Sequence, residues 1–223
     1  QQVLQGLGAM LKSALHESPR LKAQVLAVDA RLPAPRLAQR LQAQAARDAG
    51  RQVPQLRYLS ELDQAEQLTL QPMPEQPAAP ADSLWIEQGV YLITGGAGGI
   101  GQVLARAIGQ TVPDATLVLC GRSPDSGQAR QLQQQLGERA RVLYHSVDVT
   151  DAQALGGLVQ QIVSTHGRLD AVLHAAGVLR DGLLIHKTEQ DLRQVFAPKV
   201  AGLQALDEAT AQVALKLFVL FSS

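Results

Sequence analysis

The residues most able to do chemistry begin with a glycine-rich run, Thr94-Gly95-Gly96-Ala97-Gly98-Gly99-Ile100-Gly101. It lies between an apolar stretch that predicts a strand and an amphipathic stretch that predicts a helix, which is the context of a dinucleotide-binding loop. Gly95 would allow the tight turn, Gly99 the close approach of a pyrophosphate, and Gly101 close packing of helix on sheet. The N–H groups that open the helix would attract the phosphates. A glycine turn without a ligand is the alternative, and the agreement of context and spacing favours the dinucleotide.

The end of the next predicted strand indicates which dinucleotide is bound. NAD sites usually place Asp or Glu there to accept from the ribose hydroxyls, but this chain has Cys120, Gly121, Arg122 and Ser123. A guanidinium can donate two parallel hydrogen bonds to a phosphate. We therefore interpret Arg122 as the contact to the 2′-phosphate of NADPH, with an exposed loop arginine as the alternative. Cys120 fits a buried small apolar residue better than a reactive thiol.

Two further strand ends are candidates for the same ligand. Asp148 and Val149 follow the third predicted strand, where a carboxylate could accept from the adenine amino group. The alternative role for Asp148 is that of a helix cap, because Asp148, Thr150 and Asp151 all suit a helix start. After the fourth strand, small residues would let the backbone lie against the cofactor ribose in the run His174-Ala175-Ala176-Gly177. His174 itself is interpreted as a structural histidine rather than as a catalyst.

Composition excludes several other classes. Lys+Arg and Asp+Glu both total 20 in 223 residues, and a protein that binds nucleic acid usually shows a basic excess. The single cysteine excludes an internal disulfide framework and a cysteine-based zinc site, and it fits a reducing, cytoplasmic location. We expect no membrane partner, because no run of 18 apolar residues occurs and the first residues lack the basic segment of a signal peptide.

The elements that must position these residues alternate between strand and helix from residue 89 onward. Apolar strands that alternate with helices of 10–15 residues predict a parallel sheet covered on both faces. The predicted strands are Val90–Ile93, Ala115–Cys120, Val142–Tyr144, Ala171–His174 and Leu217–Phe221. The first predicted helix follows the glycine-rich run and ends at about Gln110. The others cover Gln128–Leu136, Asp151–His166 and Thr188–Ala209, the last with a break or kink at Pro198. This is a Rossmann-like, doubly wound α/β fold, incomplete because such folds have about six strands.

The first third of the chain predicts a smaller α/β unit. A helix that Pro19 ends, a strand at Gln24–Val28, a helix at Pro35–Ala49 and possible strands at Leu56–Leu59 and Gln67–Leu70 occupy residues 1–70. Residues 71–88 are rich in proline and alanine and predict an extended linker. Residues 89–223 then form the dinucleotide-binding subdomain.

Taken together, TGGAGGIG, the Asp-Val pair, HAAG and the final serine pair resemble the short-chain dehydrogenase/reductase superfamily. The longer segments YLITGGAGGIG, LHAAGVLRDGLL, FAPKVAGL and LFVLFSS resemble the ketoreductase domain of modular polyketide synthases. The LRD element and the many glutamines look most like the bacterial trans-acyltransferase type. The resemblance is strong over 89–223 and weaker over 4–70, which looks like the end of the family's structural subdomain.

The resemblance implies roles for two residues near the end of the chain. The family's catalytic serine matches Ser223, which would donate to the substrate carbonyl, and its catalytic lysine matches Lys199 in the segment APKV. The lysine charge would stabilise the developing alkoxide and lower the pKa of the catalytic tyrosine. The alternatives are a strand-end hydroxyl for Ser223 and an exposed helix lysine for Lys199.

The family's proton donor is a tyrosine about 13 residues beyond the serine, and none of Tyr58, Tyr91 and Tyr144 matches it. We therefore expect a piece of a ketoreductase, cut at both ends, that is inactive on its own. The complete domain would reduce the β-keto group of a polyketide chain carried by the phosphopantetheine of an acyl carrier protein, beside neighbouring synthase domains. A non-catalytic scaffold domain and a free-standing short-chain dehydrogenase are the alternatives.

Asp181 matches the aspartate of the family's LDD-type motif, with Arg180 in the middle position. In the family this aspartate marks B-type reductases, which give a D-configured alcohol. The alternative is that Asp181 only caps a loop or pairs with Arg180, and Arg180 itself is interpreted as solvent-exposed.

Overall fold

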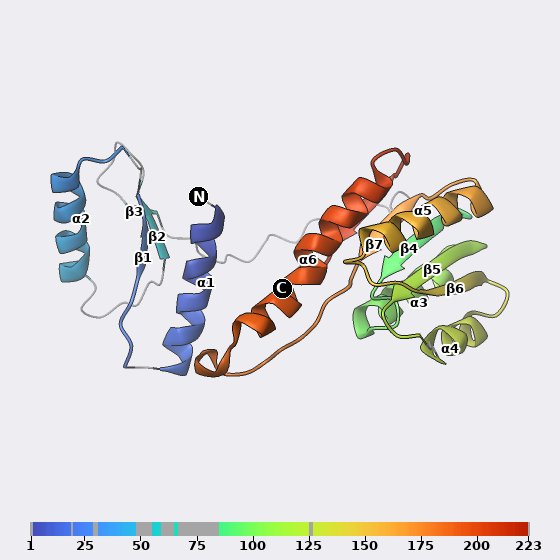
Figure 1. The fold of residues 1–223 in the computed structure, drawn as a ribbon, viewed down its shortest axis with the longest axis horizontal. Coiled ribbons are helices and arrows are strands. Elements are labelled where there is room, and N and C mark those ends of the chain that lie inside the picture. Colours follow the sequence, from blue (N-terminus) through green and yellow to red (C-terminus); the bar gives the residue numbers. More distant parts are fainter. Residues whose placement is uncertain are drawn as a thin grey trace. The chain divides into compact units, whose positions relative to one another are not determined.

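The computed structural model describes residues 2–18, 20–28, 31–47, 55–58, 65–66, 85–124 and 127–222 (Figure 1). The chain forms two compact units. The first comprises Gln1–Gln76 with Gly182–Lys187, and the second comprises Pro77–Asp181 with Thr188–Ser223. The chain therefore leaves the second unit for six residues between its fourth strand and its last helix, and then returns.

The first unit is a small α/β unit in which β1 pairs with β2 in parallel and β2 pairs with β3 antiparallel. Its elements are α1 (Gln2–Glu17), β1 (Val25–Ala27), α2 (Ala34–Arg47), β2 (Gln55–Tyr58) and β3 (Ala65–Glu66). The predicted strand at 67–70 and residues 71–84 of the linker predicted over 71–88 lie outside the described residues. Within this unit both carboxylate oxygens of Glu17 accept from the backbone N–H of Leu184, at 2.8 and 3.0 Å.

The second unit is built on a five-stranded, fully parallel sheet in the order β6-β5-β4-β7-β8. Its strands are β4 (Val90–Thr94), β5 (Ala115–Gly121), β6 (Ala140–Ser146), β7 (Ala171–His174) and β8 (Leu217–Leu220). Its helices are α3 (Gly99–Thr111), α4 (Gly127–Leu136), α5 (Ala152–His166) and α6 (Glu189–Thr210). These elements confirm the Rossmann-like α/β fold that the sequence predicts.

The alternation of side chains along the strands divides the core into two layers. Tyr91 and Ile93 of β4 pack with α3 and α4 through residues such as Ile108. Val90 and Leu92 point to the opposite face and pack with α5 and α6. All five residues of β4 are buried, because apolar side chains on both faces of a central parallel strand are covered by helices.

Helix α6 begins one residue later than expected and ends at Thr210. Thr188 is its N-cap, and a reciprocal pair of bonds with Asp191 forms a capping box. The helix continues through Pro198 without a break, so of the two outcomes predicted for this proline the break is wrong. Pro198 is itself buried, and packing holds the helix together around the missing N–H.

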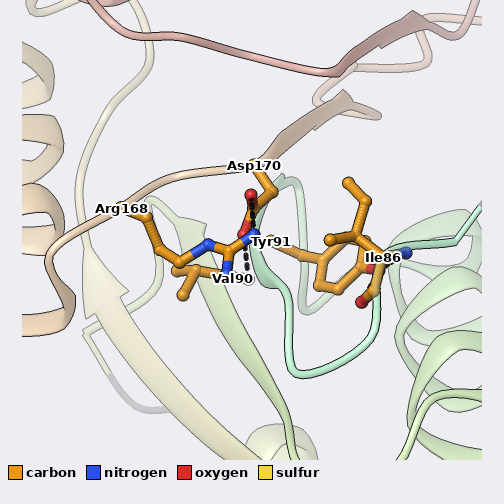
Figure 2. A network of polar contacts seen from close by, with 5 residues as sticks. All are labelled: Ile86, Val90, Tyr91, Arg168 and Asp170. Atoms are coloured by element: carbon orange, nitrogen blue, oxygen red, sulfur yellow. Dashed lines mark hydrogen bonds and ion pairs between the residues drawn. The ribbon is translucent and has the colours of Figure 1, made fainter.

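A polar network joins three strands at the amino edge of the sheet (Figure 2). The buried Asp170 accepts from the backbone N–H of Val90 at 2.9 Å through one carboxylate oxygen and pairs with the half-exposed Arg168 through the other. Its backbone carbonyl accepts from the N–H groups of Lys216 and Leu217. One residue therefore sets the starting register of β4, β7 and β8, at the opposite edge from the glycine loop.

This network predicts unequal costs for its two charged members. Asp170→Ala leaves the buried N–H of Val90 without an acceptor, so we expect the free energy of unfolding to fall by about 1–3 kcal/mol. In Arg168→Gln the buried carboxylate of Asp170 keeps the N–H of Val90, and the glutamine amide can still donate to it, so only the charge of a half-exposed partner is lost and we expect a loss of about 0–1 kcal/mol. Asp170→Asn keeps an acceptor for Val90 and should lie between the two. Urea unfolding of the three variants measures this, and a larger loss for Arg168→Gln than for Asp170→Ala would contradict it.

Candidate functional site

The glycine loop turns sharply at the carboxyl end of β4. Gly95 has φ of 65°, and a Cβ on it would lie 2.7 Å from the carbonyl oxygen of Ala175. A Cβ on Gly101 would collide with the carbonyl oxygen of Gly95, so the first turn of α3 lies directly against the loop. Both positions therefore require glycine for reasons of backbone geometry and close approach.

The start of α3 faces the same edge with its N–H groups uncapped by any side chain. Gly98 is the N-cap and makes no side-chain bond to the helix. The amide of Gln102 donates to the carbonyl of Gly96 at 2.6 Å and so holds the loop against the helix. A rigid loop that leads into the positive end of a helix is suited to a phosphate group.

At the end of β5, the loop residues Gly121, Arg122 and Ser123 carry no carboxylate. Arg122 is exposed and lines the cavity described below. Cys120, one residue before the loop, is fully buried, and burial raises the pKa of its thiol to about 12. The interpretation of Cys120 as a small apolar core residue is therefore confirmed.

At the end of β6, the structure separates the roles of two aspartates. Asp151 is the N-cap of α5 and accepts from the N–H of Ala154 at 3.0 Å. Asp148 instead accepts from the N–H and hydroxyl of Thr150, at 2.9 and 2.8 Å. The side chain that caps the helix is thus that of Asp151, and Asp148 lies at the cavity wall.

At the end of β7, the buried His174 has a hydrogen-bond partner at each ring nitrogen. Nδ1 lies 2.7 Å from the hydroxyl oxygen of Thr94, and Nε2 lies 2.9 Å from the carbonyl oxygen of Pro198. A carbonyl can only accept, so Nε2 carries the proton and the hydroxyl of Thr94 donates to Nδ1. The same hydroxyl oxygen accepts from the N–H of Ala176 at 3.3 Å. The neutral imidazole thus ties β4, β7 and α6 together.

A cavity of about 520 Å³ opens where these strand ends meet, within the range of small-molecule sites. It is lined by many of the residues that the sequence predicted for a dinucleotide. These are Gly95, Ala97, Gly98, Gly121, Arg122, Ser123, Asp148, Val149, Ala175, Ala176 and Gly177. The structure therefore brings four separate strand ends to one cavity.

Some predicted residues do not line this cavity. They are Thr94, Gly96, Gly99, Ile100, Gly101 and His174. Thr94 and His174 are the buried last residues of β4 and β7, and Gly101 is buried in the first turn of α3. These three support the cavity from below.

The cavity also has walls that sequence reasoning missed. These are Tyr144, Val147, Thr150, Val178, Arg180, Gln194, Ala197 and Pro198. Arg180 is exposed, as predicted, but its Nε also donates to the amide oxygen of Gln194 at 2.9 Å, which joins the loop after β7 to α6. Only the fold brings α6 to this edge, so no local signal identified its residues.

The residues assigned through the family resemblance lie elsewhere or cannot be placed. Lys199 lines a second hollow on the surface of α6 and β8, together with Phe218 and Leu220. Asp181 is exposed at the point where the chain leaves the second unit. Ser223 lies outside the described residues.

No described helix is long and apolar enough to span a membrane. Within the described residues, no group of three or more His, Cys, Asp or Glu side chains is arranged to hold a metal ion.

Comparison with known families identifies the second unit. Residues 89–223, more than half of the chain, match the KR domain family. The chain belongs to the ketoreductase (KR) domain family. Ketoreductases are oxidoreductases that, like other short-chain dehydrogenases, generally use a nicotinamide dinucleotide.

The relatives of this KR chain are polyketide synthases. It is 37% identical over 226 residues to polyketide synthase PksN of Bacillus subtilis (strain 168), covering all of this chain and 4% of the relative. It is 35% identical over 225 residues to polyketide synthase PksL of the same organism, covering all of this chain and 5% of the relative. The chain therefore spans about one-twentieth of these relatives, which are far longer.

Two solved ketoreductases share the fold over nearly the whole KR chain. A ketoreductase domain from the bacillaene assembly line superposes with a TM-score of 0.73 at 31% identity, covering 98% of this chain and 50% of that one. An N-terminal ketoreductase from the macrolactin assembly line gives a TM-score of 0.70 at 28% identity, covering 97% and 43%. The likeness extends over the first unit as well as the second.

The histidine network predicts how the stability of the KR unit depends on pH. Burial lowers the pKa of His174, the bond to Pro198 opposes this shift, and the nearby charge of Lys199 adds to it. The unfolded chain therefore binds a proton on this histidine at a higher pH than the folded chain does. The free energy of unfolding should fall as the pH drops below about 6.5, the ordinary value for histidine.

Chemical denaturation between pH 5 and 8 measures this effect. In His174→Gln the glutamine amide replaces the imidazole with one donor and one acceptor that do not titrate in this range. The free energy of unfolding of this variant should therefore depend less steeply on pH. His186→Gln is the matched control, because it removes an exposed histidine that bonds neither Thr94 nor Pro198, and its profile should stay as steep as that of the parent chain. A profile for His174→Gln as steep as that of the parent chain would contradict the assignment.

Proposed function

We propose that this chain is the NADPH-binding part of a reductase that acts on the β-keto group of a polyketide acyl thioester. The single observation that carries the proposal is that the glycine loop and Arg122 line the same cavity. A nicotinamide cofactor supplies hydride. A phosphate-binding turn beside an arginine, at a strand end without a carboxylate, favours the phosphorylated cofactor NADPH over NADH.

Each strand end around the cavity suits one part of that cofactor. The start of α3 would bind the pyrophosphate through its N–H groups, and Arg122 would bind the 2′-phosphate. The carboxylate of Asp148 has one oxygen engaged by Thr150, and it would accept from the adenine amino group beside Val149. Ala175, Ala176 and Gly177 present little side chain, so backbone can lie against the ribose.

The reduction adds hydride to the β-carbon and a proton to the carbonyl oxygen. By the family resemblance, Ser223 donates a hydrogen bond to that oxygen and the charge of Lys199 stabilises the alkoxide as it forms. The proton comes from a tyrosine in the family. Tyr91 does not fill this role, because its hydroxyl is bonded to the backbone of Ile86 at the amino edge. Tyr144 of β6 does not fill it either, because its hydroxyl donates to the backbone carbonyl of Ser123.

The substrate we propose is a β-ketoacyl chain on the phosphopantetheine of an acyl carrier protein, within a synthase that supplies the neighbouring domains. The polyketide synthases to which this chain is similar support this context. Asp181 is proposed to bias the face on which the β-keto group binds, so that the alcohol is D-configured. The carboxylate is exposed, as a residue at the mouth of a site would be.

The cofactor assignment predicts a selective loss of affinity in Arg122→Ala. Removing a charge-assisted contact to the 2′-phosphate should weaken NADPH by about 1.5–3 kcal/mol. NADH lacks that phosphate, so its affinity should change little. Titration of both cofactors into the 223-residue chain, followed by nicotinamide fluorescence, measures the two dissociation constants.

Arg139→Ala is the matched control, because it removes the same charge from an exposed position that does not line the cavity. It should leave both dissociation constants nearly unchanged. Equal weakening of NADPH and NADH in Arg122→Ala would overturn the NADPH assignment.

The stereochemical assignment predicts the configuration of the product. The complete reductase domain, given NADPH and a simple β-ketoacyl thioester, should form mainly the D-alcohol, and Asp181→Asn should lower the D:L ratio. Glu189→Gln, which neutralises an exposed carboxylate paired with Arg193 on α6, should leave the ratio unchanged. Chiral chromatography of the alcohol measures this, and a mainly L product from the parent domain would show the assignment to be wrong.

A further inference from the structure

The loop that carries Arg122 is bonded to the neighbouring strand at three successive carbonyls. The carbonyl of Gly121 accepts from the N–H of Val147 at 2.9 Å, and that of Arg122 accepts from the hydroxyl of Ser146 at 3.4 Å. The carbonyl of Ser123 accepts from the hydroxyl of Tyr144 at 2.8 Å. Every peptide that flanks the Arg122 side chain is therefore fixed by β6 or by the residue that follows it.

Two of these three bonds come from side chains, and that of Tyr144 is the shorter of the two. Tyr144 and Ser146 lie on the same side of β6, because side chains two residues apart share a face of a strand. A Cβ placed on Gly121 would lie 3.2 Å from the Tyr144 hydroxyl oxygen, so the phenol reaches across the end of β5 at a point where a side chain would crowd it. The ring also forms part of the cavity wall.

The direction of this hydrogen bond decides what Tyr144 can do. A carbonyl only accepts, so the phenol proton points at Ser123, and only acceptor lone pairs remain on the hydroxyl. Burial, the larger cause, and the neighbouring Cys120 both raise the pKa of Tyr144, so the phenol keeps this proton. The oxygens of a phosphate group accept hydrogen bonds, and the Tyr144 hydroxyl has no second proton to donate to them. Tyr144 is therefore placed to act on the loop and not as a phosphate ligand.

We propose that Tyr144 is a positioning residue for cofactor selection: it holds the Gly121–Ser123 loop so that the Arg122 guanidinium meets the 2′-phosphate. This inference rests on the proposed NADPH function. A long arginine side chain loses conformational freedom when it binds. A fixed backbone at its base limits the volume that the guanidinium explores before the cofactor arrives.

The test is a double-mutant cycle between Tyr144 and Arg122 in the 223-residue chain. Tyr144→Phe removes only the hydroxyl, and we expect the dissociation constant for NADPH to rise about 3–10-fold, as for loss of one hydrogen bond. The constant for NADH should stay within about twofold. In the Arg122→Ala background, Tyr144→Phe should have no further effect on NADPH, because the group that the loop positions is gone.

Tyr91→Phe is the matched control. It removes another hydroxyl bonded to backbone, that of the tyrosine at the amino edge of β4, and it should change neither dissociation constant (Figure 2). A merely structural role for Tyr144 would weaken NADPH and NADH together, and that result would overturn the inference. A loss that persists in the Arg122→Ala background would also overturn it, because Tyr144 would then contact the phosphate itself.

Failure of the inference is distinguishable from failure of the proposed function. Equal effects of Arg122→Ala on the two cofactors would overturn the NADPH assignment of the proposed function. A selective effect of Arg122→Ala without one of Tyr144→Phe would remove only the role of Tyr144. If Tyr144→Phe does not fold, Gly121→Ala crowds the same hydroxyl, and we expect the same selective loss of NADPH affinity.

Discussion

The structure depends on the buried parallel pairing of β4 with strands on both sides. Thr94, the last residue of β4, is in register with Cys120 of β5 and His174 of β7, and Cys120 is in register with His145 of β6. Four strands therefore end at nearly one level, and the loops that follow meet at one edge. Ligands of open α/β sheets bind at this edge. A slip of register would separate the glycine loop from Arg122 and remove the shared cavity.

The two edges of the sheet are held by different kinds of interaction. At the amino edge, Asp170 joins three strands through one carboxylate and one carbonyl. At the carboxyl edge, His174 joins Thr94 to the carbonyl of Pro198. Both groups are buried polar side chains with their hydrogen-bonding atoms engaged, the condition under which burial of polarity specifies one arrangement. The carboxyl edge also forms the wall of the cavity.

Residues 89–223 match the KR domain family, and the cavity lies at the strand ends of this part of the chain. The loop after β7 differs from the other loops at the strand ends, because it is divided between the two units. It leaves the second unit after Asp181, and Gly182–Lys187 belongs to the first unit, where Glu17 binds the N–H of Leu184. The N–H that the Glu17 oxygens accept from is the one that opens the short helix Leu184–His186. The segment that bears Asp181 is thus anchored on its far side.

The sequence by itself determined the strands, the glycine loop and the absence of a carboxylate beside Arg122. These are local properties: runs of apolar residues, glycines where φ is positive, and residue type at a strand end. It left open whether the last helix breaks at Pro198 or continues with a kink, because the answer depends on packing against the rest of the unit and on the bond from His174 to the Pro198 carbonyl. Nor did it identify Tyr144 or Gln194 as cavity residues. Tyr144 reaches the loop only because β6 pairs with β5, and Gln194 reaches Arg180 only because α6 packs across the sheet. Contacts between segments far apart in the chain are decided by the tertiary structure, since no local pattern encodes which strand or helix lies beside which.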